Sequence, residues 1–235
     1  MDMEIYLKGV KNLITPDISE VAAIFSDKSR AIMLVELLGG ARTTGELAKI
    51  ANIKPQTATY HLNKMADNKL IIKNRFGRNS YYKIASEDVA KILEALLQLS
   101  KDPKIKSLKE SIKSEQIRFA RLCYDHIAGK LGVILFNKLI ELNYAKVIGN
   151  SVFLTEEGIL NLKNIGFIIN ENKEYIGELC RDWSEKAHHV SGAIGNMLYI
   201  SLLNLDLIEK DPDSRKIKLK NSGKAFLKEN FNINI

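Results

Sequence analysis

Apolar residues recur at the spacing of one helical face between positions 29 and 67, in three successive stretches. The first stretch, 29–38, ends at a pair of glycines, which is typical of a helix C-terminus. Its wide apolar face consists of Ile32, Leu34, Val35, Leu37 and Leu38. The second stretch begins at Thr43 or Thr44, either of which suits a helix N-cap, and turns Leu47, Ala48 and Ile50 inward. The pattern therefore predicts two short helices before a turn at 51–54.

The third stretch, 54–67, predicts a helix with one apolar and one polar face. Pro55 suits the first position of a helix, because that position needs no backbone N–H group. The buried face is predicted to consist of Ala58, Leu62 and Met65. The opposite face carries side chains that are able to reach base edges or phosphates, namely Gln56, Thr57, Thr59, Tyr60, Asn63 and Lys64.

Two short strands are predicted after this helix, at 70–74 and 80–84. The connection between them contains Gly77, which supplies a turn, and two arginines, Arg75 and Arg78, at its tip. A helix–turn–helix followed by a basic β-hairpin is a winged helix. In such domains the second helix enters the major groove of DNA, and the wing contacts the backbone or the minor groove.

Positive charge is concentrated on this region. Residues 40–85 carry nine Lys and Arg against two Asp and Glu, whereas residues 122–235 carry fourteen of each sign. A chain that needed charge only for solubility would spread it along its length. The concentration therefore indicates a surface that neutralises phosphates.

The composition describes a globular chain. Its 235 residues are 46% apolar, it has four prolines, and no apolar run approaches the ~18 residues of a membrane helix. The first fifteen residues carry Asp2 and Glu4 ahead of their apolar part, unlike a secretory signal. We therefore expect a cytoplasmic protein, with Cys123 and Cys180 as thiols.

Three segments of the chain together resemble the ArsR family of winged-helix repressors. They are FSDKSRAIMLVELL, TTGELAKIANIKPQTATYHLNKMADNKLI and the wing ending in YYKI, within residues 20–100. The resemblance implies a homodimer built on the first and last helices of this domain, and repression that an effector relieves. The residues expected to contact DNA are Thr44, Lys54, Gln56, Thr57, Thr59, Tyr60, His61, Asn63, Lys64, Arg75 and Arg78. For His61 a packing or phosphate contact is favoured over a metal-binding role.

The metal sites familiar in that family are absent from this chain. Gly45-Glu46-Leu47-Ala48 stands where metal-sensing members carry cysteines, and the helix after the wing has no histidine. That last helix is expected to begin at Ser86 and to present Val89, Ile92, Leu93 and Leu96 on one dimerising face. Any sensing must therefore use other residues.

A basic segment, 101–122, follows and is predicted to be a helical linker. Its apolar stripe contains Ile105, Leu108, Ile112 and Ile117. A solvated face explains its charge better than additional phosphate contacts do.

The remaining chain, 123–235, contains an internal duplication. HIAGKLGVILFNKLIELNYAK, from His126, aligns with HVSGAIGNMLYISLLNLDLIEK, from His189. Each repeat, about 126–170 and 189–235, is predicted to be a winged-helix-like unit of a long helix, a β-hairpin and a closing helix. The hairpin strands are expected at 145–148 with 152–155 and at 207–209 with 216–220. The paired glycines favour close backbone packing over room for a ligand.

Cysteine, histidine and aspartate gather just before each repeat, in Cys123-Tyr124-Asp125-His126 and from Cys180 to His189. The spacing of Cys123 and His126 predicts one shared helix face. Three interpretations remain open. The first is a soft-metal site of Cys123, His126 and Cys180 with His188 or His189. The second is an effector pocket of Tyr124, His126, Trp183, His188 and His189. The third is a structural core in which Asp125 and Asp182 cap helices.

Cysteine, histidine and aspartate side chains could also form the active site of a thiol enzyme. The chain has no nucleophile turn, oxyanion loop or glycine-rich phosphate loop, so we expect no enzymatic activity.

The sequence thus predicts a mainly α protein with small β-hairpins. Its expected parts are an extension at 1–19, a winged helix at 20–100, a linker at 101–122 and a duplicated domain at 123–235. The expected function is a sequence-specific, homodimeric DNA-binding repressor that an effector releases at the C-terminal domain. The alternatives are a repressor that senses a soft metal ion, the one cofactor left open, and a nucleoid-type DNA-binding protein without an effector.

Overall fold

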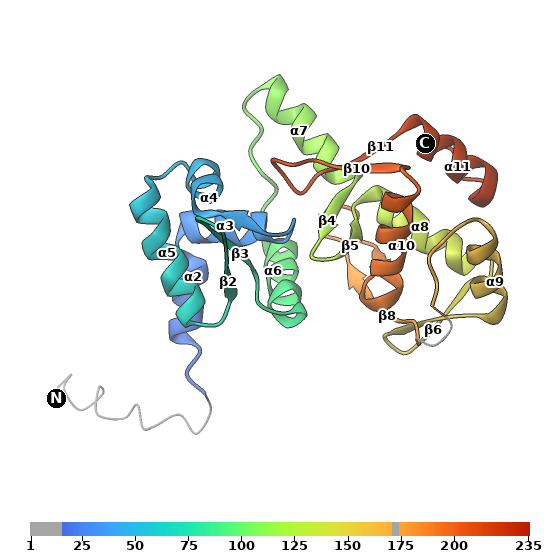
Figure 1. The fold of residues 1–235 in the computed structure, drawn as a ribbon, viewed down its shortest axis with the longest axis horizontal. Coiled ribbons are helices and arrows are strands. Elements are labelled where there is room, and N and C mark those ends of the chain that lie inside the picture. The colour runs from blue at the N-terminus through green and yellow to red at the C-terminus, as the bar shows by residue number, and fades with distance from the viewer. Residues whose placement is uncertain (1–15, 171–173) are drawn as a thin grey trace, which may run out of the picture.

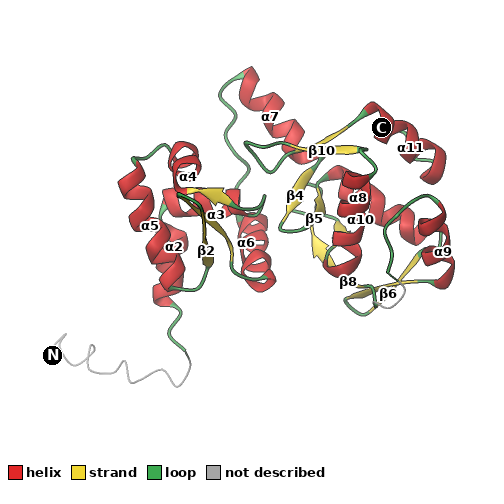
Figure 2. Cartoon of the chain, in the orientation of Figure 1, coloured by secondary structure: helices red, strands yellow, loops and turns green. Residues whose placement is uncertain are grey.

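The computed structural model describes residues 16–170 and 174–235, which form two lobes with separate hydrophobic cores (Figure 1). The acidic residues Asp2 and Glu4 and most of the predicted N-terminal extension lie in residues 1–15, outside the described part. Helices and small antiparallel sheets make up both lobes, as the sequence predicts (Figure 2). The N-terminal lobe is blue to green in Figure 1, and the C-terminal lobe runs from light green to red.

The N-terminal lobe has the helix order of a winged helix. Its elements are α2 (Ser19–Ser26), α3 (Lys28–Leu37), β1 (Arg42–Thr43), α4 (Thr44–Ala51), α5 (Pro55–Asp67), β2 (Ile71–Phe76), β3 (Asn79–Ile84) and α6 (Glu87–Leu99). The strands form one antiparallel sheet in the order β1-β3-β2. The predicted helix–turn–helix and wing are therefore confirmed.

Local chemistry sets the ends of these helices. Thr43 caps α4 in a capping box with Glu46, and Asn52 ends the helix in the left-handed conformation at φ 54°. Pro55 opens α5, as predicted. The α5 residues Ala58, Leu62 and Met65 are completely buried, so the helix keeps its polar face toward solvent.

The wing and α6 differ from the prediction in detail. The wing strands are longer than expected and leave only Gly77 and Arg78 as the turn, with Gly77 at φ 58°. Arg75 therefore lies within β2 and not at the tip. In α6, Val89 and Leu93 are buried in the domain core, whereas Ile92 and Leu96 are exposed, so the predicted single face is two faces.

The C-terminal lobe repeats a hairpin–helix–hairpin–helix unit. After α7 (Leu108–Phe119), the first copy consists of β4 (Arg121–Cys123), β5 (His126–Ala128), α8 (Lys130–Glu141), β6 (Ala145–Ile148), β7 (Ser151–Leu154) and α9 (Glu156–Asn164). The second copy consists of β8 (Ile176–Arg181), β9 (His188–Val190), α10 (Gly192–Asn204), β10 (Ile208–Lys210), β11 (Ile217–Leu219) and α11 (Asn221–Phe231). The β6-β7 and β8-β9 hairpins join in one four-stranded sheet.

The first hairpin of each copy corrects two predictions. His126 and His189 lie in strands β5 and β9, not in the helices that follow. Cys123 and His126 consequently share no helix face, and instead they pair directly across the β4-β5 hairpin. The segment 101–122 is helical only over α7, and its last residues belong to β4.

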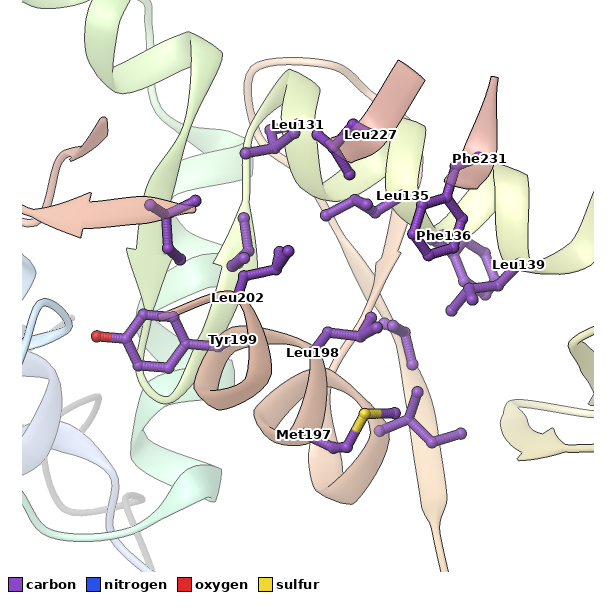
Figure 3. Close-up of a cluster of buried hydrophobic side chains, with 14 of the residues drawn as sticks. Leu131, Leu135, Phe136, Leu139, Met197, Leu198, Tyr199, Leu202, Leu227 and Phe231 are labelled. Atoms are coloured by element: carbon purple, nitrogen blue, oxygen red, sulfur yellow. The ribbon is translucent and has the colours of Figure 1, made fainter. Parts of the chain in front are cut away.

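The two copies pack in a crossed arrangement. Helix α8 contacts β9 of the other copy, and α10 contacts β5. A Cβ atom on Gly132 would lie 2.3 Å from the Ile127 carbonyl oxygen, and one on Gly195 would lie 2.3 Å from that of Val190. The predicted close backbone packing is therefore confirmed. Leu131 and Leu135 of α8 and Leu198 and Leu202 of α10 fill the core between the copies (Figure 3).

Helix α6 joins the two lobes (Figure 1). Its buried Glu94 lies 3.2 Å from Arg215, which is also buried. On the rim of this contact, Lys91 forms a salt bridge of 2.6 Å with Glu178 of β8. Separating the two side chains would leave a buried charge without its partner, so this contact holds α6 against the C-terminal lobe.

Replacing Gly195 with alanine should destabilise the C-terminal lobe, because the new methyl group would overlap the Val190 carbonyl oxygen and the His126 side chain. Overpacking of this kind costs about 1–3 kcal/mol of the free energy of unfolding, measurable by urea denaturation. Gly45→Ala is the matched control, since nothing lies within 4 Å of its Cβ position. Equal effects of the two substitutions would show that close packing at Gly195 is unimportant.

Candidate functional site

The exposed face of α5 carries most of the residues expected to contact DNA. Lys54, Gln56, Thr57, Thr59 and Asn63 are exposed. Tyr60 keeps 64% of its surface open to solvent, although aromatic side chains tend to be buried. Together they form a polar surface along a single helix, which we call the α5 face.

The wing adds positive charge beside the α5 face. Arg75 and Arg78 are exposed, and neither forms a salt bridge within the described residues. Lys73 and Lys83 are also exposed on the two wing strands, and sequence reasoning did not single them out. The alternation of side chains along a strand is the signal that would have indicated them.

Arg42 and three of the residues expected to contact DNA are not fully exposed. Arg42 is buried and pairs with Glu36 at 3.2 Å, so it stabilises the fold and offers no charge to a partner. His61 is half-buried, and its Nδ1 lies 3.3 Å from the Arg30 guanidinium. A packing contact thus accounts for His61. Thr44 and Lys64 are also half-buried.

A second group of functional side chains lies in the C-terminal lobe. The ligand atoms of Cys123, His126, Cys180 and His189, the Cys/His cluster, all lie within 4.8 Å of one another. Register explains the arrangement, because Cys123 pairs with His126 across one hairpin and Cys180 with His189 across the other. Crossed packing then brings the histidines together, with their Nε2 atoms 3.1 Å apart.

Carboxylates face the other nitrogen of each histidine ring. Asp125 Oδ1 lies 3.2 Å from His126 Nδ1, and Asp182 Oδ2 lies 3.4 Å from His189 Nδ1. The structural-core interpretation of the sequence predicts both aspartates as helix caps. Asp125 contacts the imidazole, and Asp182 accepts hydrogen bonds from the turn at Ser184 and Glu185 and from Gly129, which precedes α8.

Asp182 also holds a buried cation. Its carboxylate lies 2.9 Å from Arg121 Nη2, and both side chains are fully buried. Burial alone would raise the pKa of Asp182, but contacts with His189, Arg121 and Ser184 outweigh it and hold the pKa well below its usual range. Asp182 is therefore an anion at the centre of the lobe.

The cluster perturbs its own thiol and imidazole. A hydrogen bond with Cys180 and burial raise the pKa of Cys123 well above its usual range. Burial lowers the pKa of His126, but the Cys123 sulfur and the Asp125 carboxylate outweigh it and raise the pKa to about 10. These shifts disfavour a thiolate nucleophile at Cys123 in the protein without ligands.

A pocket of about 190 Å³ connects the Cys/His cluster with α6. Its lining includes Tyr124, Cys123, His126 and Cys180 on one side and Ala90 and Glu94 of α6 on the other. A molecule or ion bound here would touch both lobes.

The predicted effector residues are thus divided. Tyr124 lines the pocket, and His126 and His189 belong to the cluster. Trp183 lies elsewhere, with its ring 4.5 Å from the Arg121 guanidinium and 5.2 Å from that of Arg118. His188 is exposed and is not part of the cluster, so only the His189 alternative of the metal hypothesis has the required geometry.

Comparison with known proteins identifies the class of the molecule. A family model described as a helix-turn-helix domain matches residues 25–73. Over 228 residues the chain is 39% identical to the "Uncharacterized HTH-type transcriptional regulator YdfF" of Bacillus subtilis (strain 168), covering 94% of this chain and 100% of that protein. The chain therefore belongs to this family of HTH-type transcriptional regulators, and it is a DNA-binding regulator with a winged-helix domain.

Solved structures similar to the chain are also regulators. The homodimeric winged helix-turn-helix domain of Mb0332 from Mycobacterium bovis, a possible ArsR-family regulator, is 29% identical. The match covers 35% of this chain and 75% of that one, with a TM-score of 0.33. The AntR antimony-specific transcriptional repressor is 27% identical, over 42% of this chain and 93% of its own, also with a TM-score of 0.33. Among the described residues, no helix has the length and apolar character needed to cross a membrane.

Asp182→Asn should lower the free energy of unfolding by about 3–5 kcal/mol at neutral pH, because Arg121 would stay buried without its anion. The fold stabilises the charged carboxylate. The effect is therefore fully present above the unfolded pKa of about 3.9, and it is lost as pH falls through the lower folded pKa. Urea denaturation at several pH values measures this dependence. The exposed Asp213→Asn is the control, and an equal loss in both variants would contradict the role of Asp182.

Proposed function

We propose that the protein is a homodimeric, sequence-specific repressor that an effector releases from DNA by acting on the C-terminal lobe. The observation that supports this best is the α5 face, an exposed row of polar side chains beside two wing arginines that form no salt bridge with any described residue. Helix α5 would lie in the major groove, and Arg75 and Arg78 would contact phosphates or the minor groove.

The placement of charge along the chain supports a DNA-binding N-terminal lobe and a regulatory C-terminal lobe. Residues 40–85 hold nine cationic side chains against two acidic ones, and Arg42 is the one that the fold buries in an ion pair. The C-terminal residues 122–235 are balanced in charge, so they add no general attraction for a polyanion. The N-terminal lobe would therefore bind DNA, and the C-terminal lobe would regulate that binding.

Arg75→Ala combined with Arg78→Ala should weaken binding to every DNA sequence and reduce the slope of log K against log salt by about 1.8, because two phosphate contacts are lost. Fluorescence anisotropy over a salt series measures both effects. Lys224→Ala with Lys228→Ala removes the same charge from exposed positions of α11 and should leave the slope unchanged. Tyr60→Ala on the α5 face should instead alter the preference between sequences. A wing variant that changes only sequence preference would contradict the assignment.

Exposed apolar side chains support the dimer. Ile92, Leu96 and Leu99 follow one another at i, i+4 and i+7 on α6, with exposed fractions of 47%, 39% and 85%. At the start of α2, the N-cap residue Ile18 and the helical residue Val21 are exposed as well. Two helices of the N-terminal lobe with exposed apolar side chains are suited to a symmetric interface. A dimer on these helices would present two copies of α5 to two half-sites.

Leu96→Glu with Leu99→Glu should convert the dimer into a monomer and weaken operator binding, since buried charges oppose association at an apolar interface. Sedimentation velocity measures the mass in solution. Leu160→Glu is the matched control, because Leu160 is 61% exposed on α9 of the other lobe. A dimer that persists in the α6 variant would refute this interface.

The position of the pocket supports effector control. Its lining includes residues of α6, the proposed dimer helix, and of the hairpins that carry the Cys/His cluster. An effector that favours one arrangement of these elements would shift the population of DNA-binding dimers.

A further inference from the structure

The Cys/His cluster has the symmetry of a shared binding site. Each copy of the repeat contributes one cysteine and one histidine, which are paired across a hairpin: Cys123 with His126, and Cys180 with His189. The crossed packing of α8 on β9 and of α10 on β5 places the two hairpins against each other. Gly195 makes this possible for His126, because its Cβ position would lie 2.8 Å from the His126 Cβ atom.

The separations within the cluster fit one tetrahedral ion. Zinc–nitrogen distances near 2.05 Å and zinc–sulfur distances near 2.3 Å place tetrahedral ligand atoms about 3.3–3.8 Å from one another. The four ligand atoms here are all within 4.8 Å of one another, and the two Nε2 atoms are 3.1 Å apart. Small movements of the side chains would therefore complete the coordination.

The orientation of the histidine rings supports the same conclusion. Histidines that ligate metals commonly donate their other N–H group to a carboxylate, which fixes the ring and exposes a lone pair. Asp125 occupies that position for His126, and Asp182 lies 3.4 Å from His189 Nδ1, close to that position but without a hydrogen bond. Two Nε2 atoms at this distance share a proton, and a metal ion could take the place of that proton.

The donor set indicates the kind of metal. Two thiols and two imidazoles suit Zn²⁺ and related soft or borderline ions, whereas Mg²⁺ and Ca²⁺ require oxygen ligands. A disulfide between Cys123 and Cys180 is the rival use of the thiols, but it would leave unexplained the two histidines that converge on the same point with carboxylates behind them.

Each cysteine is one residue away from a contact with the DNA-binding lobe. Tyr124, after Cys123, donates its backbone N–H to the Leu38 carbonyl at 2.8 Å. Arg181, after Cys180, accepts a hydrogen bond from Gln98 of α6 at 3.0 Å. Cys180 is only partly buried and lines the pocket beside α6, which gives an ion a route of entry.

We propose that Cys123, His126, Cys180 and His189 bind a single ion of the Zn²⁺ class in tetrahedral geometry and that this ion is the effector of the regulator. The first half of the proposal stands on the cluster alone. The second half rests on the proposed function, because it requires effector-controlled DNA binding. Metal binding displaces to solvent the two thiol protons and the proton shared by the two imidazoles, and it leaves two thiolates and two neutral imidazoles around the ion.

Titration of the reduced, full-length protein with Co²⁺ tests the site without DNA. We expect one equivalent to bind, with visible bands of tetrahedral cobalt and near-ultraviolet bands of thiolate-to-cobalt charge transfer, and Zn²⁺ to displace it. Cys123→Ser and Cys180→Ser should each lose the thiolate bands or weaken binding at least tenfold. His188→Gln is the matched control, since His188 is exposed beside His189, and it should behave as the wild type.

Folding and oxidation are measured in the same samples. Circular dichroism should show that the partly buried Cys180→Ser variant stays folded, so that lost binding is not lost structure. Absence of stoichiometric cobalt binding in the wild type, or equal binding in the serine variants, would overturn the site. Loss of both free thiols on mild oxidation, together with no metal binding, would identify a disulfide switch and overturn the proposal.

Operator binding with and without Zn²⁺ tests the effector role. We expect Zn²⁺ to weaken operator binding at least tenfold in the wild type and in His188→Gln, and to have no effect on the serine variants. Metal binding without any change in operator affinity would refute the effector role and leave the site intact. If the metal-free wild type binds no operator, the proposed function fails, and the cobalt titration still decides the site.

Discussion

The buried carboxylate of Asp182 is the contact on which the C-terminal lobe depends. It neutralises the fully buried Arg121 of β4 and accepts a hydrogen bond from the backbone N–H group of Gly129, which precedes α8. It also lies behind the ring of His189. One anion thus joins the second copy of the repeat to the first copy, and it orients a residue of the Cys/His cluster. Because a buried charge is tolerated only when its partners stay in place, the crossed arrangement of the copies is rigid at this point.

Rigidity at the centre of one lobe matters to the other lobe because α6 is shared. Its buried face packs in the winged-helix core, Glu94 pairs with Arg215 of the C-terminal lobe, and Leu99 remains exposed. The same helix borders the pocket beside the Cys/His cluster. In the proposed dimer, occupancy of the cluster would therefore affect the position of α6, and the position of α6 would affect the spacing of the two α5 helices.

The winged helix was predictable from the sequence because its signals are local. A capping threonine, a proline at a helix start and a glycine turn each act within a few residues, and the helical apolar period fixes the buried face of α5. The first hairpin of each C-terminal copy was not predictable in this way. Strands β4 and β5 have three residues each, too few to show a period, so the sequence pattern predicts a helix at His126 where the structure has a strand. The sequence indicates all four residues of the cluster, but it leaves His188 and His189 as alternatives. Strand alternation and crossed packing bury His189 in the cluster and leave His188 exposed.

Linkage between the two proposed sites provides the most direct test. If an ion at the Cys/His cluster weakens operator binding, operator DNA must weaken binding of that ion by the same factor, because the coupling free energy is reciprocal. The decisive measurement is the affinity for Zn²⁺ of the free protein and of the operator-bound protein, by competition with a chromophoric chelator. The account predicts at least tenfold weaker Zn²⁺ binding in the operator complex, and equal affinities in the two states would contradict it.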